Sequence, residues 1–478
     1  MSELRLLEPN LHEVRVGARR MLFHVPTTGL YELDELSGEL LDMFRGRTGV
    51  SAQDVRRRFD GRFPADEVAE TLKGFLDLDI VSDGRAARAE HPPIRIENFP
   101  LTTIVLNVNT GCNLSCTYCY KEDLTTPAKG ERMDLETAKR SIALLLNESP
   151  TRDRYNIVFF GGEPLSNIKL IREVVDYAEP LFAGLGKTVD FTLTTNATLL
   201  TEELVDWFDA HRFGLTVSMD GPKALHDINR RTVGGKGTYD VVAAKARMLL
   251  SRYRSRPVGA RVTLTPGVTD VVAIWDHLFN DLGFHEVGFS PVTSGTMTLF
   301  NLSDGEVAEV FDGMKRLGRL YLDAALRHEN IGFSNLHQLM TDLHEGTSKA
   351  LPCGAGVGML AVDTKGGLNL CHRFTGSSLP TFGDIDGGID KPRLSRFIES
   401  RLDRSDAGCG TCRIRNLCSG GCYHESYARY NDPIHPTYHY CDLMRDWVDF
   451  GIDVYSRISA DNPAFFDAYV TPRRANGK

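Results

Sequence analysis

The distribution of cysteines constrains this 478-residue chain more than any other feature. Three of them, Cys112, Cys116 and Cys119, lie within eight residues, and seven more lie between Cys353 and Cys441. Ten thiols could form five disulfides in a secreted protein, whereas in a reducing compartment clustered cysteines are metal ligands or catalytic groups. The compartment therefore decides which kind of structure the cysteines support.

No targeting or membrane segment is recognisable in the sequence. The opening stretch MSELRLLEPNLHEVRVGARR has charges throughout and lacks the apolar core and cleavage site of a signal peptide. No apolar run approaches the roughly 18 residues of a membrane span. We therefore expect a cytoplasmic protein with reduced thiols and no membrane partner. The net charge of -9, from 55 Lys and Arg against 64 Asp and Glu, argues against nucleic-acid binding.

Residues 1–90 have the element order of a winged-helix domain. Alternating side chains predict strands at His12–Val16 and Met21–Val25, and a turn follows at Pro26–Gly29. Helical spacing then predicts three helices, around Leu36–Phe44, Ala52–Phe59 and Val68–Phe75. Winged helices bind nucleic acid or a peptide, and a purely structural cap is the alternative. The proline-containing stretch Ala86–Pro100 is a predicted linker.

Strands and helices alternate from Leu101 to about Arg327. The predicted strands are Thr103–Asn109, Asn156–Phe160, Asp190–Thr194, Gly214–Ser218, Ala260–Thr265 and Glu286–Pro291. The predicted helices between them are Leu135–Leu146, Ile168–Phe182, Glu202–His211, Tyr239–Tyr253 and Val271–Leu282. Six βα units indicate an α/β fold with a parallel sheet, either doubly wound or an incomplete barrel. In both, the chemistry lies where the strands end.

Polar or glycine-rich loops follow the first four predicted strands. They are the Cys112 to Cys119 loop, Gly161–Pro164, Thr195–Asn196 and Ser218–Gly221. Singly each is a weak signal, because Gly and Asn are common turn residues. Their joint placement predicts that they converge at one edge of the sheet.

The first three cysteines have three chemical interpretations. They are one ligand short of a closed zinc site. On a cubane iron–sulfur cluster, three thiolates leave one iron uncovered, and that iron can bind a substrate or cofactor. A redox-active thiol site is the third possibility.

The string Cys112-Asn-Leu-Ser-Cys-Thr-Tyr-Cys119 resembles the signature of the radical S-adenosylmethionine (radical SAM) enzymes, and Gly161-Gly162-Glu163-Pro164 is similar to their second motif. The resemblance implies a partial (β/α)6 barrel spanning about residues 98–330. It also implies that a 4Fe-4S cluster binds the amino and carboxylate groups of S-adenosylmethionine (AdoMet). One-electron reduction then releases a 5'-deoxyadenosyl radical.

The same resemblance assigns roles to single residues. The cluster ligands would be Cys112, Cys116 and Cys119. The AdoMet contacts would be Tyr118 at the adenine, Gly161, Gly162 and Glu163 at the amino group, Ser218 and Arg230 at the ribose and carboxylate, and Arg261 as a weaker candidate for the carboxylate. Glycines allow close backbone approach, and arginine suits a carboxylate.

The seven downstream cysteines are similar to a SPASM domain, here residues 331–450, followed by a C-terminal tail at 451–478. By this resemblance, Cys409, Cys412, Cys418 and Cys441 would hold one auxiliary 4Fe-4S cluster. Cys353, Cys371 and Cys422 would hold a second, whose fourth ligand would be Asp363, a substrate thiolate or nothing.

Two residues depart from the sulfatase-maturing members of this family. Those members have an acidic base after the second SPASM cysteine, where this chain has His372, and Gln before the GGEP motif, where this chain has Phe160. Both differences argue against formylglycine formation. His372 is a candidate catalytic base or, alternatively, a hydrogen-bond donor to the neighbouring cluster.

The whole arrangement most resembles the enzymes that mature quinohemoprotein amine dehydrogenase. These install thioether bonds between cysteine sulfur and Asp or Glu methylene carbons in a small Cys-rich subunit. The winged helix would bind the polypeptide as an added strand, and a flavodoxin- or ferredoxin-type donor would supply electrons. The alternatives are another radical SAM peptide maturase, forming a different thioether or a carbon–carbon crosslink or epimerising a residue, and a zinc-binding winged-helix regulator.

Metal analysis separates these classes. Protein purified without oxygen should be brown and contain about twelve irons per chain, since three cubanes carry four irons each. Iron, sulfide and zinc determination checks this. A colourless protein containing zinc would contradict the iron–sulfur interpretation.

Overall fold

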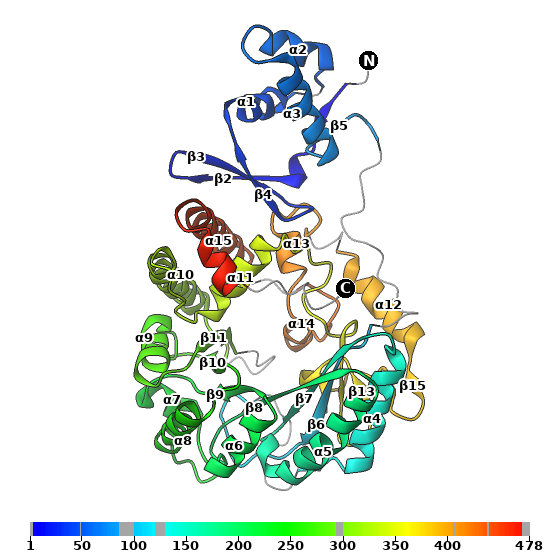
Figure 1. The fold of residues 1–478 in the computed structure, drawn as a ribbon, viewed down its shortest axis with the longest axis vertical. Helices are drawn as coiled ribbons and strands as arrows, with labels where there is room; N and C mark the ends of the chain where they lie inside the picture. Colours follow the sequence, from blue (N-terminus) through cyan, green and yellow to red (C-terminus); the bar gives the residue numbers. More distant parts are fainter. Residues whose placement is uncertain are drawn as a thin grey trace.

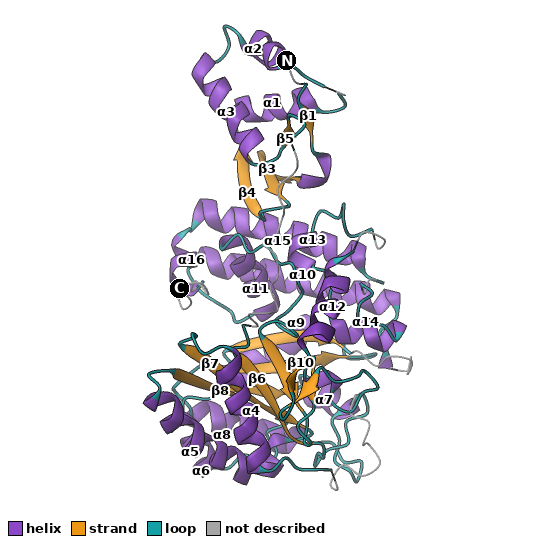
Figure 2. Cartoon of the chain, turned by 90° about the vertical axis from the view of Figure 1, so that its right-hand side faces the viewer, coloured by secondary structure: helices purple, strands orange, loops and turns teal. Residues whose placement is uncertain are grey.

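The computed structural model describes residues 3–47, 49–85, 100–119, 130–292, 300–404, 408–436 and 439–470. A small N-terminal domain, a central layer of helices and an open sheet are stacked along the long axis of the molecule (Figures 1 and 2). Residues 86–99, most of the predicted linker, lie outside the described part. No described helix is long and apolar enough to cross a membrane.

Six parallel strands form the partial barrel that the sequence predicts. They are β6 (Thr103–Asn109), β7 (Arg154–Gly161), β8 (Thr188–Thr195), β9 (Gly214–Ser218), β10 (Val258–Leu264) and β11 (Glu286–Pro291). They pair in chain order, each parallel to the next. Every predicted strand is present, and β6, β9 and β11 have the predicted bounds. Their parallel arrangement brings all six C-terminal ends to one edge of the sheet.

Helices cover the outer face of this sheet (Figure 1). They are α4 (Leu135–Glu148), α5 (Ile168–Gly184), α6 (Glu202–Ala210), α7 (Lys223–Asn229), α8 (Tyr239–Arg252) and α9 (Val271–Asp276). The last predicted helix, Val271–Leu282, is only partly α-helical, because its second half, His277–Asp281, forms a π-helical turn. Apolar residues on alternate strand positions, such as Val262 on β10, are buried against these helices, so the residues between them face inward.

The N-terminal domain has a core of its own. Its elements are β1 (Arg5–Leu6), β2 (Leu11–Val16), β3 (Arg19–His24), β4 (Gly29–Leu33), α1 (Glu35–Phe44), α2 (Ala52–Phe59), α3 (Ala65–Asp77) and β5 (Val81–Ser82). Both predicted strands and all three predicted helices are present, and the turn at residues 25–28 leads into a third strand, β4, that the sequence analysis missed. On β3, Leu22 belongs to the domain's core while Phe23 joins the main core of the protein. The antiparallel sheet therefore packs on both faces.

The cysteine-rich region is continuous with the barrel. Strand β12 (Met359–Val362) pairs in parallel with β6, and β13 (Leu368–Asn369) pairs antiparallel with β12, so the sheet has eight strands. A short hairpin follows, formed by β14 (Gly383–Asp384) and β15 (Gly388–Ile389). Buried side chains of the barrel and of this region form one hydrophobic cluster. Folding of one part thus depends on the other.

Helices of the C-terminal half make up the central layer (Figure 2). They are α10 (Asp304–Leu326), α11 (Ser334–His344), α12 (Lys391–Leu402), α13 (Arg415–Cys418), α14 (Tyr423–Tyr430), α15 (Cys441–Asp461) and α16 (Ala464–Tyr469). Helix α15 begins at Cys441 and packs against α10, α11 and β2. Part of α15 and all of α16 fall within the predicted tail, whose last residues, 471–478, lie outside the described part.

Two glycines of α10 offer a matched test of this packing. A methyl group on Gly318 would lie 2.4 Å from Phe450 Cε1 on α15, whereas one on Gly305 would meet nothing within 4 Å. Gly318→Ala should therefore lower the free energy of unfolding by about 1–3 kcal/mol through overpacking. Gly305→Ala should be neutral or slightly stabilising. Thermal unfolding of both variants checks this, and equal unfolding temperatures would contradict the packing described.

Candidate functional site

The first cysteine loop and the GGEP loop are packed backbone to backbone. The Glu163 N–H donates to the Gly111 carbonyl, and the Gly162 N–H donates to the Asn109 carbonyl, both at 3.1 Å. A Cβ atom on Gly162 would lie 2.0 Å from the Gly111 carbonyl oxygen. Only glycine permits this approach, which places the GGEP loop directly beside Cys112.

Glu163 ties this loop to the end of β8. Its carboxylate accepts hydrogen bonds from Thr195 Oγ1 at 2.7 Å, the Asn196 N–H at 2.8 Å and the Leu165 N–H at 3.0 Å. Burial raises the pKa of Glu163. Its own N–H and carbonyl also bond within the protein. Glu163 therefore stabilises the conformation of the loop.

A buried ion pair lies close to Cys116, the second cysteine of the first group. Arg230 donates to Asp220 through Nε at 2.8 Å and Nη2 at 3.2 Å, and both side chains are buried. Asp220 also accepts from the Tyr118 hydroxyl at 2.7 Å and from the Thr263 N–H at 2.9 Å. The Arg230 guanidinium lies 5.5 Å from the centre of the Tyr118 ring. Asp220 thus fixes two residues that the sequence predicts as AdoMet contacts.

The charges of Asp220 and Arg230 affect the pKa of Cys116. Although burial alone would lower it, Asp220 holds the pKa of Arg230 above its ordinary value. Burial raises the pKa of Cys116 to about 11, against the opposing effect of Arg230. Burial likewise raises the pKa of Cys112 to about 12. Metal binding at these thiols must therefore release protons.

The inner face of the sheet carries Ser218 and Arg261. They are directly opposed in the register of β9 and β10. Arg261 donates to Ser290 Oγ on β11. The structure thus brings Ser218 and Arg261 together on neighbouring strands.

Four downstream cysteines surround one cavity. Cys409, Cys412, Cys418 and Cys441 all line a hollow of about 270 Å³. Their thiols influence one another electrostatically, since Cys409, Cys412 and Cys418 all help to raise the pKa of Cys441 after the larger effect of burial. The donor set and the cavity fit a cubane cluster held by four thiolates.

The other three downstream cysteines form a separate group. Cys353 and Cys422 both contribute, after burial, to the raised pKa of Cys371. Asp363 is engaged elsewhere, because its carboxylate accepts from the backbone N–H groups of residues 365 and 367, both at 2.9 Å, and from Asn369 at 3.1 Å. It therefore stabilises the β12–β13 turn.

Among the described residues, no three His, Cys, Asp or Glu side chains are arranged around a single metal ion. A cubane does not require this arrangement, because each thiolate binds a different iron.

His372 contacts the barrel. Its ring centre lies 4.1 Å from that of Phe160 at the end of β7. Thr375, just beyond, accepts a 3.0 Å hydrogen bond from Asn107 on β6. The segment after Cys371 therefore lies over the inner face of the sheet. The two positions that depart from the sulfatase-maturing enzymes are neighbours in space.

The residues between Cys412 and Cys418 hold the N-terminal domain. Arg415 donates to the Pro9 carbonyl at 2.7 Å and to Asn10 Oδ1 at 3.1 Å. Asn416 donates to the carbonyls of Val25 at 3.0 Å and of the next residue at 3.2 Å. The sequence analysis gave these residues no role.

Comparison with known proteins identifies the barrel. Residues 106–274 match the model of the Radical SAM superfamily. This segment is a radical SAM domain. The cofactors of the radical SAM domain are a 4Fe-4S cluster and AdoMet.

Curated relatives extend the similarity. The serine-type anaerobic sulfatase-maturating enzyme of Klebsiella aerogenes is 25% identical over 351 residues, covering 70% of this chain and 84% of that enzyme. An uncharacterized protein of Methanocaldococcus jannaschii is 32% identical over 163 residues, or 34% of this chain. The match spans about half of that relative, 52% of its length.

Two solved structures share the fold of this chain. AnSMEcpe with bound AdoMet and a peptide has a TM-score of 0.63 at 19% identity, covering 76% of this chain and 99% of that one. Streptococcus suis SuiB bound to the precursor peptide SuiA has a TM-score of 0.52 at 16% identity, covering 92% and 99%. The α/β barrel, the small N-terminal domain and the cysteine-rich C-terminal region are thus features of a known architecture.

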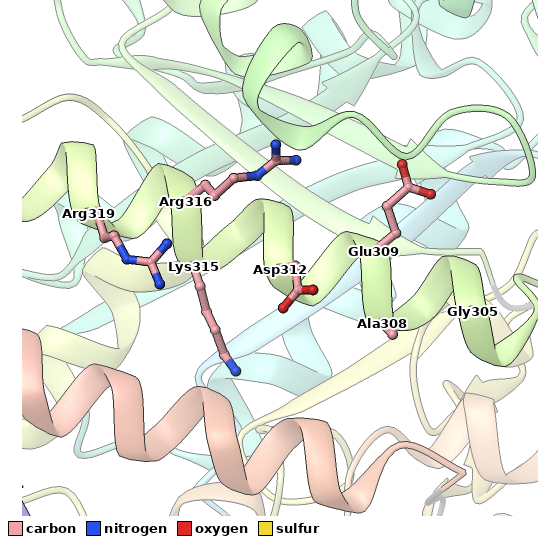
Figure 3. A pocket seen from close by; sticks show the side chains of 7 residues that line it. All are labelled: Gly305, Ala308, Glu309, Asp312, Lys315, Arg316 and Arg319. Atoms are coloured by element: carbon pink, nitrogen blue, oxygen red, sulfur yellow. The ribbon is translucent and has the colours of Figure 1, made fainter.

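A second hollow lies away from the radical SAM site. It measures about 670 Å³ and is lined by α10 residues alone, namely Gly305, Ala308, Glu309, Asp312, Lys315, Arg316 and Arg319 (Figure 3). None of these residues was predicted as a site residue. The hollow contains neither a cysteine nor a GGEP residue and is not part of the radical SAM site.

The Asp220–Arg230 pair provides a stability test. Asp220→Ala would leave a buried guanidinium without its carboxylate, which should cost about 3–5 kcal/mol. The exposed pair Lys223–Asp240 is the control, and Asp240→Ala should cost at most about 1 kcal/mol. Thermal unfolding under anaerobic conditions measures both. Equal losses would show that Asp220 does not hold Arg230 as described.

Proposed function

We propose that this radical SAM enzyme forms intrapeptidyl thioether crosslinks between a cysteine sulfur and an Asp or Glu methylene carbon. The substrate would be a small Cys-rich polypeptide, the small subunit of a quinohemoprotein amine dehydrogenase. The contact between His372 and Phe160 is the main structural support. It places both departures from the sulfatase-maturing enzymes on one side of the inner face, where a different reacting side chain would be accommodated.

The three cysteine groups support a chemistry that needs three clusters. Cys112, Cys116 and Cys119 would hold the cluster that binds AdoMet, and the groups of four and three would hold two auxiliary clusters. When bound, the clusters and AdoMet would together supply an electron for AdoMet cleavage, the 5'-deoxyadenosyl radical that results and an acceptor for one electron. A flavodoxin- or ferredoxin-type protein is the proposed reductant. The substrate would lose a hydrogen atom from carbon to the radical, a proton from sulfur to a base and one electron to the acceptor, and would gain one C–S bond.

The chain's own residues would orient the reactants. Asp220 holds Arg230 and Tyr118 where AdoMet is expected. The buried Glu163 keeps the GGEP loop closed on Cys112. His372 projects from the segment next to an auxiliary cluster, and we propose it as the base for the substrate thiol.

The N-terminal domain is the proposed binding element for the polypeptide. In the described residues, β4 pairs with β3 and with no other strand, so its outer edge offers backbone groups to an added strand. SuiB, which is similar over most of this chain, is bound to a precursor peptide in its solved structure. This likeness supports the same class of substrate here.

Product analysis tests the reaction. Each thioether should remove two hydrogens and one alkylatable thiol from the polypeptide. A carbon–carbon crosslink would remove two hydrogens and leave every thiol, and epimerisation would change neither. Mass spectrometry before and after thiol alkylation distinguishes these outcomes. Products with all thiols intact would overturn the proposal.

Two cysteine variants test the separate roles of the AdoMet-binding cluster and the auxiliary clusters. Cys112→Ala should abolish 5'-deoxyadenosine formation, because the AdoMet-binding cluster loses a ligand. Cys409→Ala should retain some cleavage and lose crosslinking, because only an auxiliary cluster is damaged. Chromatography of 5'-deoxyadenosine and mass analysis of the polypeptide give both values. Full crosslinking by Cys409→Ala would contradict the auxiliary role.

A further inference from the structure

The inner face of the barrel is polar, unlike its helix-covered side. Hydroxyl side chains stand half-buried along it, namely Thr192, Thr194, Thr216, Ser218, Thr263 and Ser290. Strand register places them on the same face. An acidic residue of this face, Asp190, is already engaged by Arg154 and Arg256. A second acidic residue of this face, Glu286, lies at the start of β11, two residues before Gly288. The face therefore presents hydroxyl donors to a polar ligand.

Arg261 carries a positive charge on this face, on β10. It opposes Ser218 on one side and Gly288 on the other. Because Gly288 has no side chain, the guanidinium can lie across β11, with Nη1 at 3.4 Å from where a Cβ would be. Nη2 donates to Ser290 Oγ. In the described part of the chain, no carboxylate lies within ion-pair distance of Arg261, so most of its donors are available to a ligand.

Arg261 is separate from the AdoMet-side arginine. Arg230 is paired with Asp220, and its positive charge lowers the pKa of Cys116 in the first cysteine group. Arg261 has its pKa lowered, first by the protein atoms crowded around it and then by the positive charge of Arg373. Arg373 belongs to the segment after Cys371 that covers the inner face. Arg261 therefore faces the space between the barrel and the group formed by Cys353, Cys371 and Cys422.

We propose that Arg261, together with Ser290, binds the carboxylate of an acidic side chain of the polypeptide substrate on the inner face of the barrel. A planar guanidinium suits bidentate carboxylate binding. This inference rests on the proposed function, which it deepens by assigning a residue that selects an acidic side chain. It also moves Arg261 from the AdoMet contacts predicted by resemblance to the substrate.

Binding measurements on the full-length holoprotein test this without turnover. The probes are glutamate and glutamine, each acetylated at the amino end and methylamidated at the carboxyl end, titrated in the presence of saturating AdoMet. The wild-type protein should bind the glutamate probe about tenfold more tightly, the value of one or two charged hydrogen bonds. Arg261→Gln should remove this preference, and Arg261→Lys should retain part of it. Arg316→Gln, at an exposed position of α10 that lines the second hollow, should leave the preference unchanged.

AdoMet also has a carboxylate, so a second titration tests whether Arg261 binds AdoMet instead of the substrate. Substrate binding predicts that Arg261→Gln changes the AdoMet affinity less than twofold. A tenfold loss of AdoMet affinity with the glutamate preference intact would assign Arg261 to AdoMet and overturn the proposal. No glutamate preference in the wild-type protein would also overturn it. Neither result depends on the product analysis, so the subsite and the thioether chemistry can fail separately.

Discussion

The parallel pairing of β12 with β6 is the constraint on which the site depends. It adds the cysteine-rich region to the barrel sheet and covers what would be an exposed edge strand. The buried side chains of both regions then form one core. As a result the segment after Cys371 lies over the inner face, and the cysteine-rich region shares both its sheet and its core with the barrel. Separate domains joined by a linker would not fix these positions relative to each other.

Buried charges hold the loops at the C-terminal edge of the sheet. Glu163 joins the ends of β7 and β8, and Asp220 joins Tyr118, Arg230 and β10. Removing such charges from water is costly, and each is compensated by several short hydrogen bonds. The loops are therefore preorganised, so a bound cofactor would not have to order them.

Much of this architecture could be predicted from sequence. Strands such as Thr103–Asn109 are rich in β-branched and apolar residues. The spacing separates the first three cysteines from the later seven, and the resemblance to the SPASM domain divides those seven into four and three. The third strand of the N-terminal domain was missed because Gly29–Leu33 is short and half-exposed. The role of Asp220 was missed because its partners lie between 10 and 102 residues away along the chain. Phe160 and His372 were noticed separately, and only the fold shows that they touch.

The hydrogen bonds between residues 412–418 and the N-terminal domain have a consequence for protein engineering. Arg415 and Asn416 are buried and donate to backbone carbonyls of residues 9, 25 and 26. A chimera that exchanged only residues 3–85 for those of a relative would set a foreign loop against these donors. Unpaired buried donors cost about 1–3 kcal/mol each. A transplanted recognition domain would therefore need to bring its matching segment between the second and third cysteines of the four-cysteine group, although that segment lies more than 300 residues away in the sequence.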